Sequence, residues 1–148
     1  MTSTMTEKMK GKDFIITGLQ SWDIPIGSNA IDIAKEIAKN NRVLYVNSPL
    51  DLMTMYRNKK TPENEHRLDV VKKFKKPIRQ ISENLWVLDF PFAVWSVNGF
   101  PDGPVFDLFN RRNNKRIFNY VKKTAAELGF ENPVHFIDND IYRSFYAK

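Results

Sequence analysis

The sequence predicts an α/β domain built on a doubly wound, mostly parallel sheet, with a β-hairpin as an excursion from it. One complete strand, loop, helix and strand unit runs from Asp13 to Asn47. Two further apolar runs follow at residues 85–90 and 133–138, with an amphipathic helix between them. Such runs are typical of parallel strands that helices cover on both faces. Because these sheets bind ligands at the carboxyl ends of their strands, the loop at residues 18–28 is the expected site.

The first unit is predicted from its hydrophobic periodicity. Runs with β-branched or aromatic residues indicate strands at residues 13–18 and 42–47. Between them, apolar residues at helical spacing predict a helix at residues 28–40, with Ser28 as a natural N-cap. The apolar face of this helix is formed by Ile31, Ala34, Ile37 and Ala38.

A polar segment and a hairpin follow the second strand. Residues 52–74 are rich in Lys, Glu and Asn, so we expect them to form a mobile excursion. Residues 78–90 predict a β-hairpin with a polar turn. Its second arm, residues 85–90, is the third core strand.

The last part of the chain predicts one more helix and one more strand. Three prolines and two glycines make residues 91–104 a long ordered loop. A helix is expected from at least about Asn113, ending at Gly129, and its exposed face is basic. The fourth strand is predicted at residues 133–138, and another helix begins at residues 139–146.

These elements predict one domain at residues 13–148, preceded by a disordered polar tail at residues 1–12. The pattern stops just after the fourth strand, whereas a doubly wound sheet normally continues with further units. We therefore expect the chain to be part of a longer protein, truncated before a second domain.

Composition excludes several classes of protein. The chain has 148 residues, of which 42% are hydrophobic, as in ordinary globular proteins. No apolar run approaches the roughly 18 residues of a membrane span, and the polar N-terminus is unlike a secretory signal. The absence of cysteine excludes disulfides and thiolate nucleophiles, and two histidines make a metal site unexpected. We expect a cytoplasmic protein with no metal and no cofactor.

The net charge of +6 leaves three interpretations open. The excess Lys and Arg residues fall in loops and on helix faces, which favours a solvated surface. The basic helix at residues 111–123 could also attract an anionic membrane surface, giving peripheral association with the inner face of the cell membrane. The third interpretation, nucleic acid, has no recognised motif in its favour, and we expect no such partner.

The loop after the first strand has features of a phosphate site. Gly18 and Gly27 permit close approach of the backbone, and Ser28 opens a helix whose N-terminus attracts anions. The spacing is neither G-x-G-x-x-G nor G-x-x-x-x-G-K-[ST], and the loop holds no Lys or Arg, so a dinucleotide or P-loop site is not supported. In the alternative interpretation, the glycines only let the chain turn and Ser28 only caps the helix.

Aromatic and polar residues at two strand ends suggest a sugar site. Trp22 lies beside Asp23, a pairing in which the ring face stacks on C–H groups while the carboxylate accepts hydroxyl hydrogen bonds. Trp95, Asn98 and Asp102 follow the third strand and could line the same cleft. The alternative for the aromatic residues is packing against the core or the sheet edge.

Three further polar residues have plain structural alternatives. Asn139, just past the fourth strand, could contact a ligand or could cap the following helix. His135 lies within a predicted strand, where a core or sheet-edge histidine is commoner than a catalytic base. His66 lies in a charged segment and is expected to be exposed.

Taken in their order, these segments resemble the N-terminal half of a GT-B type glycosyltransferase, of the bacterial group that includes surface polysaccharide and teichuronic acid biosynthesis enzymes. The resemblance lies in the loop at residues 18–28 with Trp22 and Pro25, the strand and turn at 43–49, the strand at 84–88, and the helix at 109–129 leading into 133–137. It covers most of the predicted domain.

The resemblance implies two Rossmann-like domains facing across a cleft, of which this chain is the acceptor-side one. It implies that Gly18 and its neighbours, Gly27 and Ser28, approach the phosphates or the transferred sugar of a nucleotide-sugar donor. The loop at residues 91–104 would lie nearer a saccharide or lipid-linked acceptor. The donor domain is missing from the sequence, so we expect these residues alone to be inactive. The catalytic residue stays unassigned.

Two rival functions remain at this point. A stand-alone flavodoxin-like α/β module could bind a phosphorylated ligand or a protein partner, although it would need a fifth strand and a closing helix. A nucleic-acid-binding domain could use the basic helix, and its affinity would fall steeply with salt. A sugar site would show little salt dependence.

Overall fold

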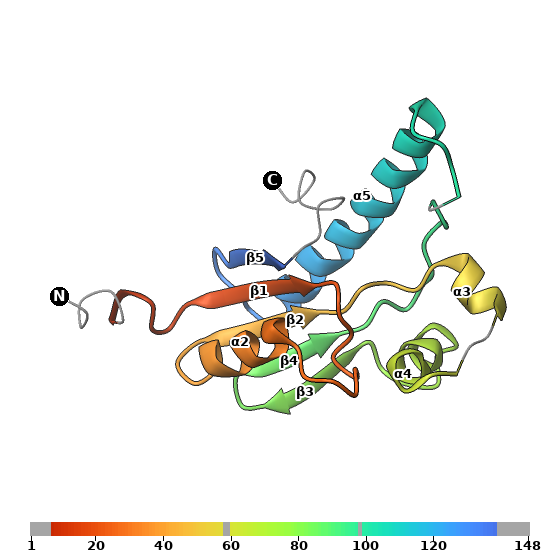
Figure 1. Cartoon of the computed structure of the whole chain (residues 1–148). Coiled ribbons are helices and arrows are strands. Elements are labelled where there is room, and N and C mark those ends of the chain that lie inside the picture. The colour runs from red at the N-terminus through yellow and green to blue at the C-terminus, as the bar shows by residue number, and fades with distance from the viewer. Residues whose placement is uncertain (1–6, 58–59, 98, 139–148) are drawn as a thin grey trace.

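The computed structural model describes residues 7–57, 60–97 and 99–138. Five strands form one open sheet, with helices around it (Figure 1). In chain order the elements are β1 (Asp13–Gly18), α2 (Asn29–Ile37), β2 (Arg42–Val46), α3 (Leu52–Arg57), α4 (Pro62–Val71), β3 (Ile78–Ser82), β4 (Leu85–Leu88), α5 (Pro104–Glu127) and β5 (Val134–Asp138).

The sheet has the order β3-β4-β2-β1-β5, and every pairing is parallel except that of β3 with β4. The predicted α/β class, the mostly parallel sheet and the hairpin are therefore confirmed. Counted along the chain, the four parallel strands lie in the order third, second, first, fourth. The strand order therefore runs outward from β1 in both directions, with β2 and β4 on one side of it and β5 on the other.

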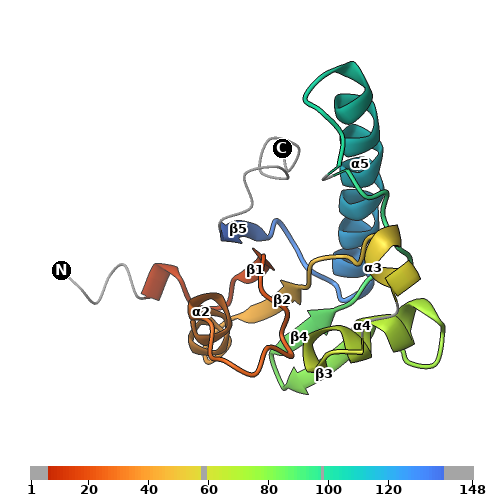
Figure 2. The ribbon, with the colours of Figure 1, turned by 45° about the vertical axis from the view of Figure 1, so that its right-hand side comes forward.

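Alternate residues of the central strands face two different helices. Phe14, Ile16 and Tyr45 belong to a buried cluster with α2, whereas Ile15 and Leu44 belong to a second buried cluster with α5. Figure 2 shows α2 and α5 on opposite sides of the sheet. This alternation is the period of two that a strand imposes, and it explains why the central strands are apolar throughout.

The expectation of a mobile excursion at residues 52–74 is wrong for most of that segment. It contains α3 and α4, and Leu68 and Val70 of α4 are buried. Thr61 and Pro62 occupy the N-cap and first position of α4, where proline fits because that position needs no hydrogen-bond donor. Because Leu68 and Val70 are the only buried residues of α4, the hydrophobic periodicity of the segment is weak.

Helix α5 begins at Pro104, earlier than the predicted core pattern at Asn113, so the loop before it ends at Gly103. Its first turns project beyond the carboxyl edge of the sheet (Figure 1), where no apolar face is required. The helix ends as predicted: Gly129 has a φ of 71°, and the Phe130 N–H donates to the Ala125 carbonyl at 2.9 Å. This is the hydrogen bond of a glycine-terminated helix.

At the N-terminus, part of the predicted tail is attached to the domain. The Gly11 N–H donates to the Asn40 carbonyl at 2.9 Å, and the Lys12 N–H donates to Asn41 Oδ1 at 2.9 Å. The predicted helix at residues 139–146 lies outside the described residues.

Candidate functional site

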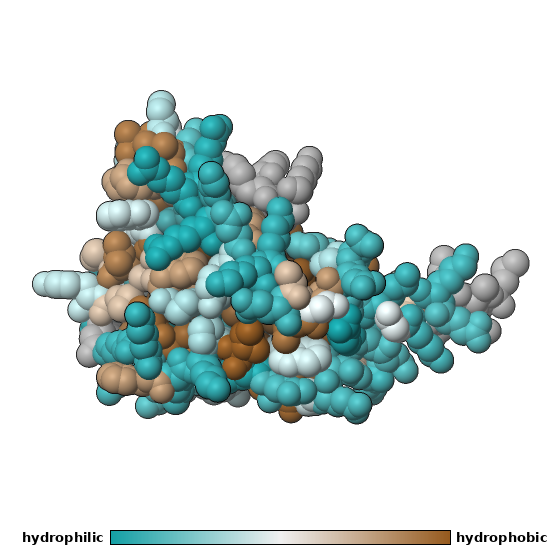
Figure 3. Space-filling view, turned by 180° about the vertical axis from the view of Figure 1, so that it is seen from behind, coloured by the Kyte–Doolittle hydropathy of each residue, from teal (hydrophilic) through white to brown (hydrophobic). Residues whose placement is uncertain are grey.

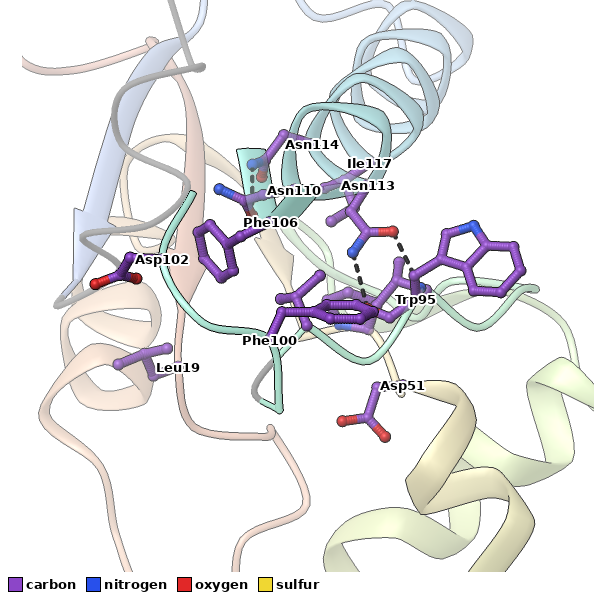
Figure 4. A pocket seen from close by; sticks show the side chains of 13 residues that line it. Leu19, Asp51, Trp95, Phe100, Asp102, Phe106, Asn110, Asn113, Asn114 and Ile117 are labelled. Carbon is purple, nitrogen blue, oxygen red and sulfur yellow. Dashed lines mark hydrogen bonds between the residues drawn. The ribbon is translucent and has the colours of Figure 1, made fainter. Parts of the chain in front are cut away.

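A pocket of about 600 Å³ lies at the carboxyl edge of the sheet, on the side of α5 (Figure 4). Leu19 comes from the loop after β1, and Pro49 and Asp51 follow β2. The loop after β4 and the first half of α5 supply the rest: Val94, Trp95, Val97, Phe100, Asp102, Phe106, Asn110, Asn113, Asn114 and Ile117. Its volume lies within the usual range of small-molecule sites, roughly 300–1,000 Å³.

The loops after β2 and β4 are joined beside this pocket by main-chain hydrogen bonds. Val94 donates its N–H to the Leu50 carbonyl at 2.9 Å and accepts from the Leu52 N–H at 3.0 Å. The Met53 N–H donates to Ser96 Oγ at 3.0 Å. These bonds continue the contact between the two chain segments beyond the sheet. The two loops that line the pocket are therefore held against each other.

Side-chain amides of α5 hold the aromatic wall in place. Asn113 is buried, and its amide accepts from the Trp95 N–H at 3.0 Å and donates to the Trp95 carbonyl at 2.9 Å. Phe109 contacts the rings of both Trp95 and Phe100, with centroid distances of 5.5 Å in each case. Trp95 is nevertheless 53% exposed, and Figure 4 shows its indole at the end of the pocket away from Asp102.

The polar lining is acidic and amide-bearing. Asp51 and Asp102 contribute carboxylates, and the Asn114 amide donates to Asn110 Oδ1 at 3.2 Å. Asp51 also caps α3, because its Oδ1 accepts from the Thr54 N–H at 2.7 Å. Among the described lining residues there is no Lys, Arg or His. The pocket can therefore accept hydroxyl or ammonium hydrogens while presenting apolar ring faces.

A second polar cluster lies at the same edge of the sheet but is closed. Asn47 and Asp89 are both fully buried, and Asn47 Nδ2 donates to Asp89 Oδ1 at 2.6 Å. Arg79 forms a bidentate pair with Asp23 at 3.0 and 2.9 Å and lies 3.3 Å from Asp89 Oδ2. The Trp22 N–H donates to Asn47 Oδ1 at 2.8 Å. We refer to Asp23, Asn47, His66, Arg79 and Asp89 as the buried polar network.

His66 belongs to this network, so the expectation that it is exposed is wrong. Its Nε2 lies 3.4 Å from Asp89 Oδ2, and 15% of its side chain is exposed. Burial and the neighbouring Arg79 lower the pKa of His66, outweighing the attraction of Asp89 and Asp23. The side chain is therefore neutral at pH 7, and the contact with Asp89 is not an ion pair there.

The predicted phosphate-loop residues are placed apart from the pocket lining. A Cβ on Gly18 would overlap the Tyr45 hydroxyl, which donates to the Gln20 carbonyl at 2.9 Å. Burial raises the pKa of Tyr45 to about 12, with Asp138 adding to the effect. Nothing lies within 4 Å of a Cβ on Gly27. Ser28 is the N-cap of α2, but its hydroxyl makes no capping hydrogen bond and is buried without a partner among the described residues.

The predicted sugar-site residues divide into two groups. Trp95 and Asp102 line the pocket. Trp22 instead packs on Tyr45 with ring centroids 5.2 Å apart, and Asp23 is paired with Arg79, so both hold the loop after β1 on the core. Asn98 and Asn139 lie outside the described residues.

The pocket residues that the sequence interpretation missed are Asp51, Asn110, Asn113 and Asn114. The last three precede Ile117 at helical spacing, on the side of α5 that faces the pocket (Figure 4). Asn113 and Asn114 are buried, which is unusual for asparagine. Asparagines in the register of a helix core were the available signal.

Helix α5 also carries a basic stripe on its exposed side. The stripe consists of Arg111, Arg112, Lys115, Arg116, Lys122 and Lys123. Figure 3 shows hydrophilic residues along the projecting helix and hydrophobic residues at its tip, where Val105 and Leu108 are exposed. Arg116 is additionally held over the Phe92 ring, 3.9 Å from its centroid.

Within the part of the chain that the structure describes, neither a membrane-spanning helix nor a metal-binding cluster is found. No helix there has the length and apolar character needed to cross a bilayer. No group of three or more His, Asp or Glu side chains is arranged there to hold a metal ion.

Comparisons of the chain with protein-family models, with curated proteins and with solved structures give no match.

Proposed function

We propose that the chain is the Rossmann-like, doubly wound, acceptor-side domain of a GT-B glycosyltransferase. The enzyme would transfer a sugar from a nucleotide-sugar donor to a saccharide or lipid-linked acceptor in cell-surface polysaccharide synthesis. The observation that carries the proposal is the aromatic, amide and carboxylate pocket at the carboxyl edge of a parallel sheet.

The strand order supports this proposal over the flavodoxin-like alternative. The third parallel strand, β4, lies outside β2. This third-second-first-fourth order is that of a Rossmann half-sheet, whereas a flavodoxin-like sheet places the third strand beside the first. The described lining residues of the pocket also include no Lys or Arg that would hold a phosphorylated ligand.

The pocket has the chemistry that a saccharide needs. Sugars present apolar C–H faces and rings of hydroxyl groups, so they bind between aromatic faces and oxygen acceptors. Trp95 and Phe100 supply exposed ring surface, and Asp51 and Asp102 supply acceptors. We assign the acceptor sugar to this pocket.

Donor binding is assigned mainly to a further domain outside this chain. Gly18, Gly27 and Ser28 are proposed to face the donor phosphates or the transferred sugar. The buried Ser28 hydroxyl at the start of α2 supports this assignment, because it has no partner among the described residues. A helix N-terminus favours an anion through its dipole and free N–H groups.

A cytoplasmic enzyme acting on a lipid-linked acceptor must reach the membrane surface. The basic stripe of α5 and the exposed Val105 and Leu108 at its tip support peripheral association with the inner face of the cell membrane. No nucleic-acid partner is proposed.

Calorimetric titration of the chain with neutral mono- and disaccharides tests the proposal. We expect binding that changes little with salt, and we expect Trp95→Ala to weaken it about fivefold, since ring contacts contribute roughly 1 kcal/mol. The matched control is Tyr56→Ala, because Tyr56 is 87% exposed and does not line the pocket. Absence of saccharide binding, or salt-dependent binding of nucleic acid, would contradict the proposal.

A further inference from the structure

We infer that the pocket selects a non-acidic sugar, either uncharged or amine-bearing, and excludes uronates and sugar phosphates. This inference rests on the proposed function and adds the charge of the substrate to it. Its starting point is a contrast: the whole chain carries a net charge of +6, but the described charged residues that line the pocket are both acidic.

The two carboxylates approach the pocket from different segments. Asp51 follows β2 and is half-buried, and Asp102 lies in the loop before α5 and is exposed. In Figure 4 Asp51 lies below Phe100, and Asp102 lies apart from it, beyond Phe106. A sugar in the pocket would have carboxylates and amides in the wall around it.

Three guanidinium groups of the domain are engaged by other groups. Arg79 is held by Asp23 in a bidentate pair. Arg67 donates to the Ser48 carbonyl at 2.9 Å and to the Glu63 carbonyl at 3.2 Å. Arg116 lies over the Phe92 ring and donates to the Ala93 carbonyl at 3.3 Å. None of these three guanidinium groups lines the pocket.

Within the described lining, an acidic ligand would therefore meet two carboxylates and no cation. Two like charges about 4 Å apart in water repel by roughly 1 kcal/mol, which corresponds to about a fivefold loss of affinity, and more in a less polar site. Uncharged hydroxyl groups instead donate to the carboxylates, and an ammonium group gains from them. Any phosphate of a lipid-linked acceptor must lie outside the pocket.

The test uses the chain itself and four probes: methyl glucoside, glucosamine, glucuronate and glucose 1-phosphate. The Trp95 indole N–H resonance, assigned with the Trp95→Ala variant, reports binding to this pocket. We expect methyl glucoside and glucosamine to bind at least about fivefold more tightly than the two acids at low salt. Salt should reduce this difference, because it screens the carboxylates.

Asp102→Asn serves as the diagnostic variant, because no described residue donates a hydrogen bond to the Asp102 side chain. We expect it to improve the binding of glucuronate and glucose 1-phosphate relative to methyl glucoside. Asp32→Asn, on the exposed side of α2, is the control with the same charge change and should leave the ratio unaltered.

The outcomes separate this inference from the proposed function. If the acids shift the Trp95 resonance as readily as methyl glucoside does, the charge selection is overturned and the sugar site stands. If Asp102→Asn and Asp32→Asn have equal effects, the assignment to Asp102 is overturned. If none of the four probes shifts the resonance, the proposed function fails together with the inference.

Discussion

The pocket and the buried polar network lie at the same edge of the sheet and use the same kinds of side chain in opposite ways. In the network, Asp23 and Asp89 face Arg79, and Asn47 joins Asp89 to the Trp22 backbone. In the pocket, Asp102 is exposed and no described cation pairs with it. The network is enclosed by protein, although Asp89 Oδ2, His66 Nε2 and Arg79 Nε have no hydrogen-bond partner among the described residues, whereas the pocket is open to solvent.

The difference distinguishes polar groups that stabilise the fold, as in the network, from a polar group that can bind a ligand, such as the Asp102 carboxylate. A buried charge is tolerated only when it is paired, so the loss of one partner strands the other. An exposed carboxylate is solvated, and its removal costs the fold little. Substitutions in the network should therefore reduce the stability of the fold, whereas substitutions of exposed pocket residues should change ligand binding instead.

The largest expected effect is that of Asp89→Ala. Asp89 is fully buried, so its removal leaves the Asn47 amide without its acceptor and takes a negative charge from beside Arg79 and His66. We expect a loss of about 3 kcal/mol in the free energy of unfolding, measured by urea denaturation. Asp102→Ala should change it by no more than roughly 0.5 kcal/mol. Equal losses would show that the two regions do not differ as argued.

Gly18→Ala should have the next largest effect. Its Cβ would overlap the Tyr45 hydroxyl, and forced overpacking of this kind costs about 1–3 kcal/mol. Gly27→Ala is the control, because nothing lies within 4 Å of that position, and thermal denaturation should show no loss. Adding Tyr45→Phe should recover part of the cost of Gly18→Ala. If the two substitutions show no such coupling, contact with the Tyr45 hydroxyl is not the reason that position 18 requires glycine.

Asn113→Ala should act on the pocket wall at a smaller cost. Both hydrogen bonds between its amide and the Trp95 main chain would be lost, which costs about 1–2 kcal/mol. We expect faster hydrogen exchange at the Trp95 amide, measured by NMR. Asn119→Ala, at an exposed position of the same helix, should leave that exchange rate unchanged.

The smallest effect concerns acid sensitivity of the network. Burial, and then Arg79, lower the pKa of His66 from 6.5 in the folded protein. The unfolded chain therefore binds a proton that the folded protein refuses, and stability is lost as the pH falls below about 6.5 toward the lowered pKa. His66→Gln should weaken this loss as the pH falls below about 6.5, as seen in denaturation midpoints. If the pH dependence of stability is the same in His66→Gln as in the original protein, His66 does not contribute to the acid sensitivity of the network.

Most of the sheet could be predicted from the sequence, because its central strands are continuous apolar runs. The strands at Phe14, Val43 and Leu85 follow from such runs, and the end of α5 follows from Gly129. Helix α4 could not be predicted in the same way. It buries only Leu68 and Val70, and its remaining contacts are polar side chains such as His66, whose partners come from other elements.

The site was predictable only in part for the same reason. Trp95 and Asp102 follow a core strand and could be expected at the carboxyl edge. Trp22 and Asp23 have equally suggestive types, yet Tyr45 and Arg79 engage them. The asparagines of α5 form one wall of the pocket only because the loop after β4 folds back against that helix.

By itself, the sequence determined the α/β class, the mostly parallel sheet, the hairpin and the end of α5, because these depend on local periodicity and on glycine. The tertiary structure decided the strand order, the burial of His66 and the division of the polar residues between a closed network and an open pocket. Those properties depend on residues that meet from distant parts of the sequence, such as Asp23 and Arg79, which are 56 positions apart. Local pattern carries no information about such pairings.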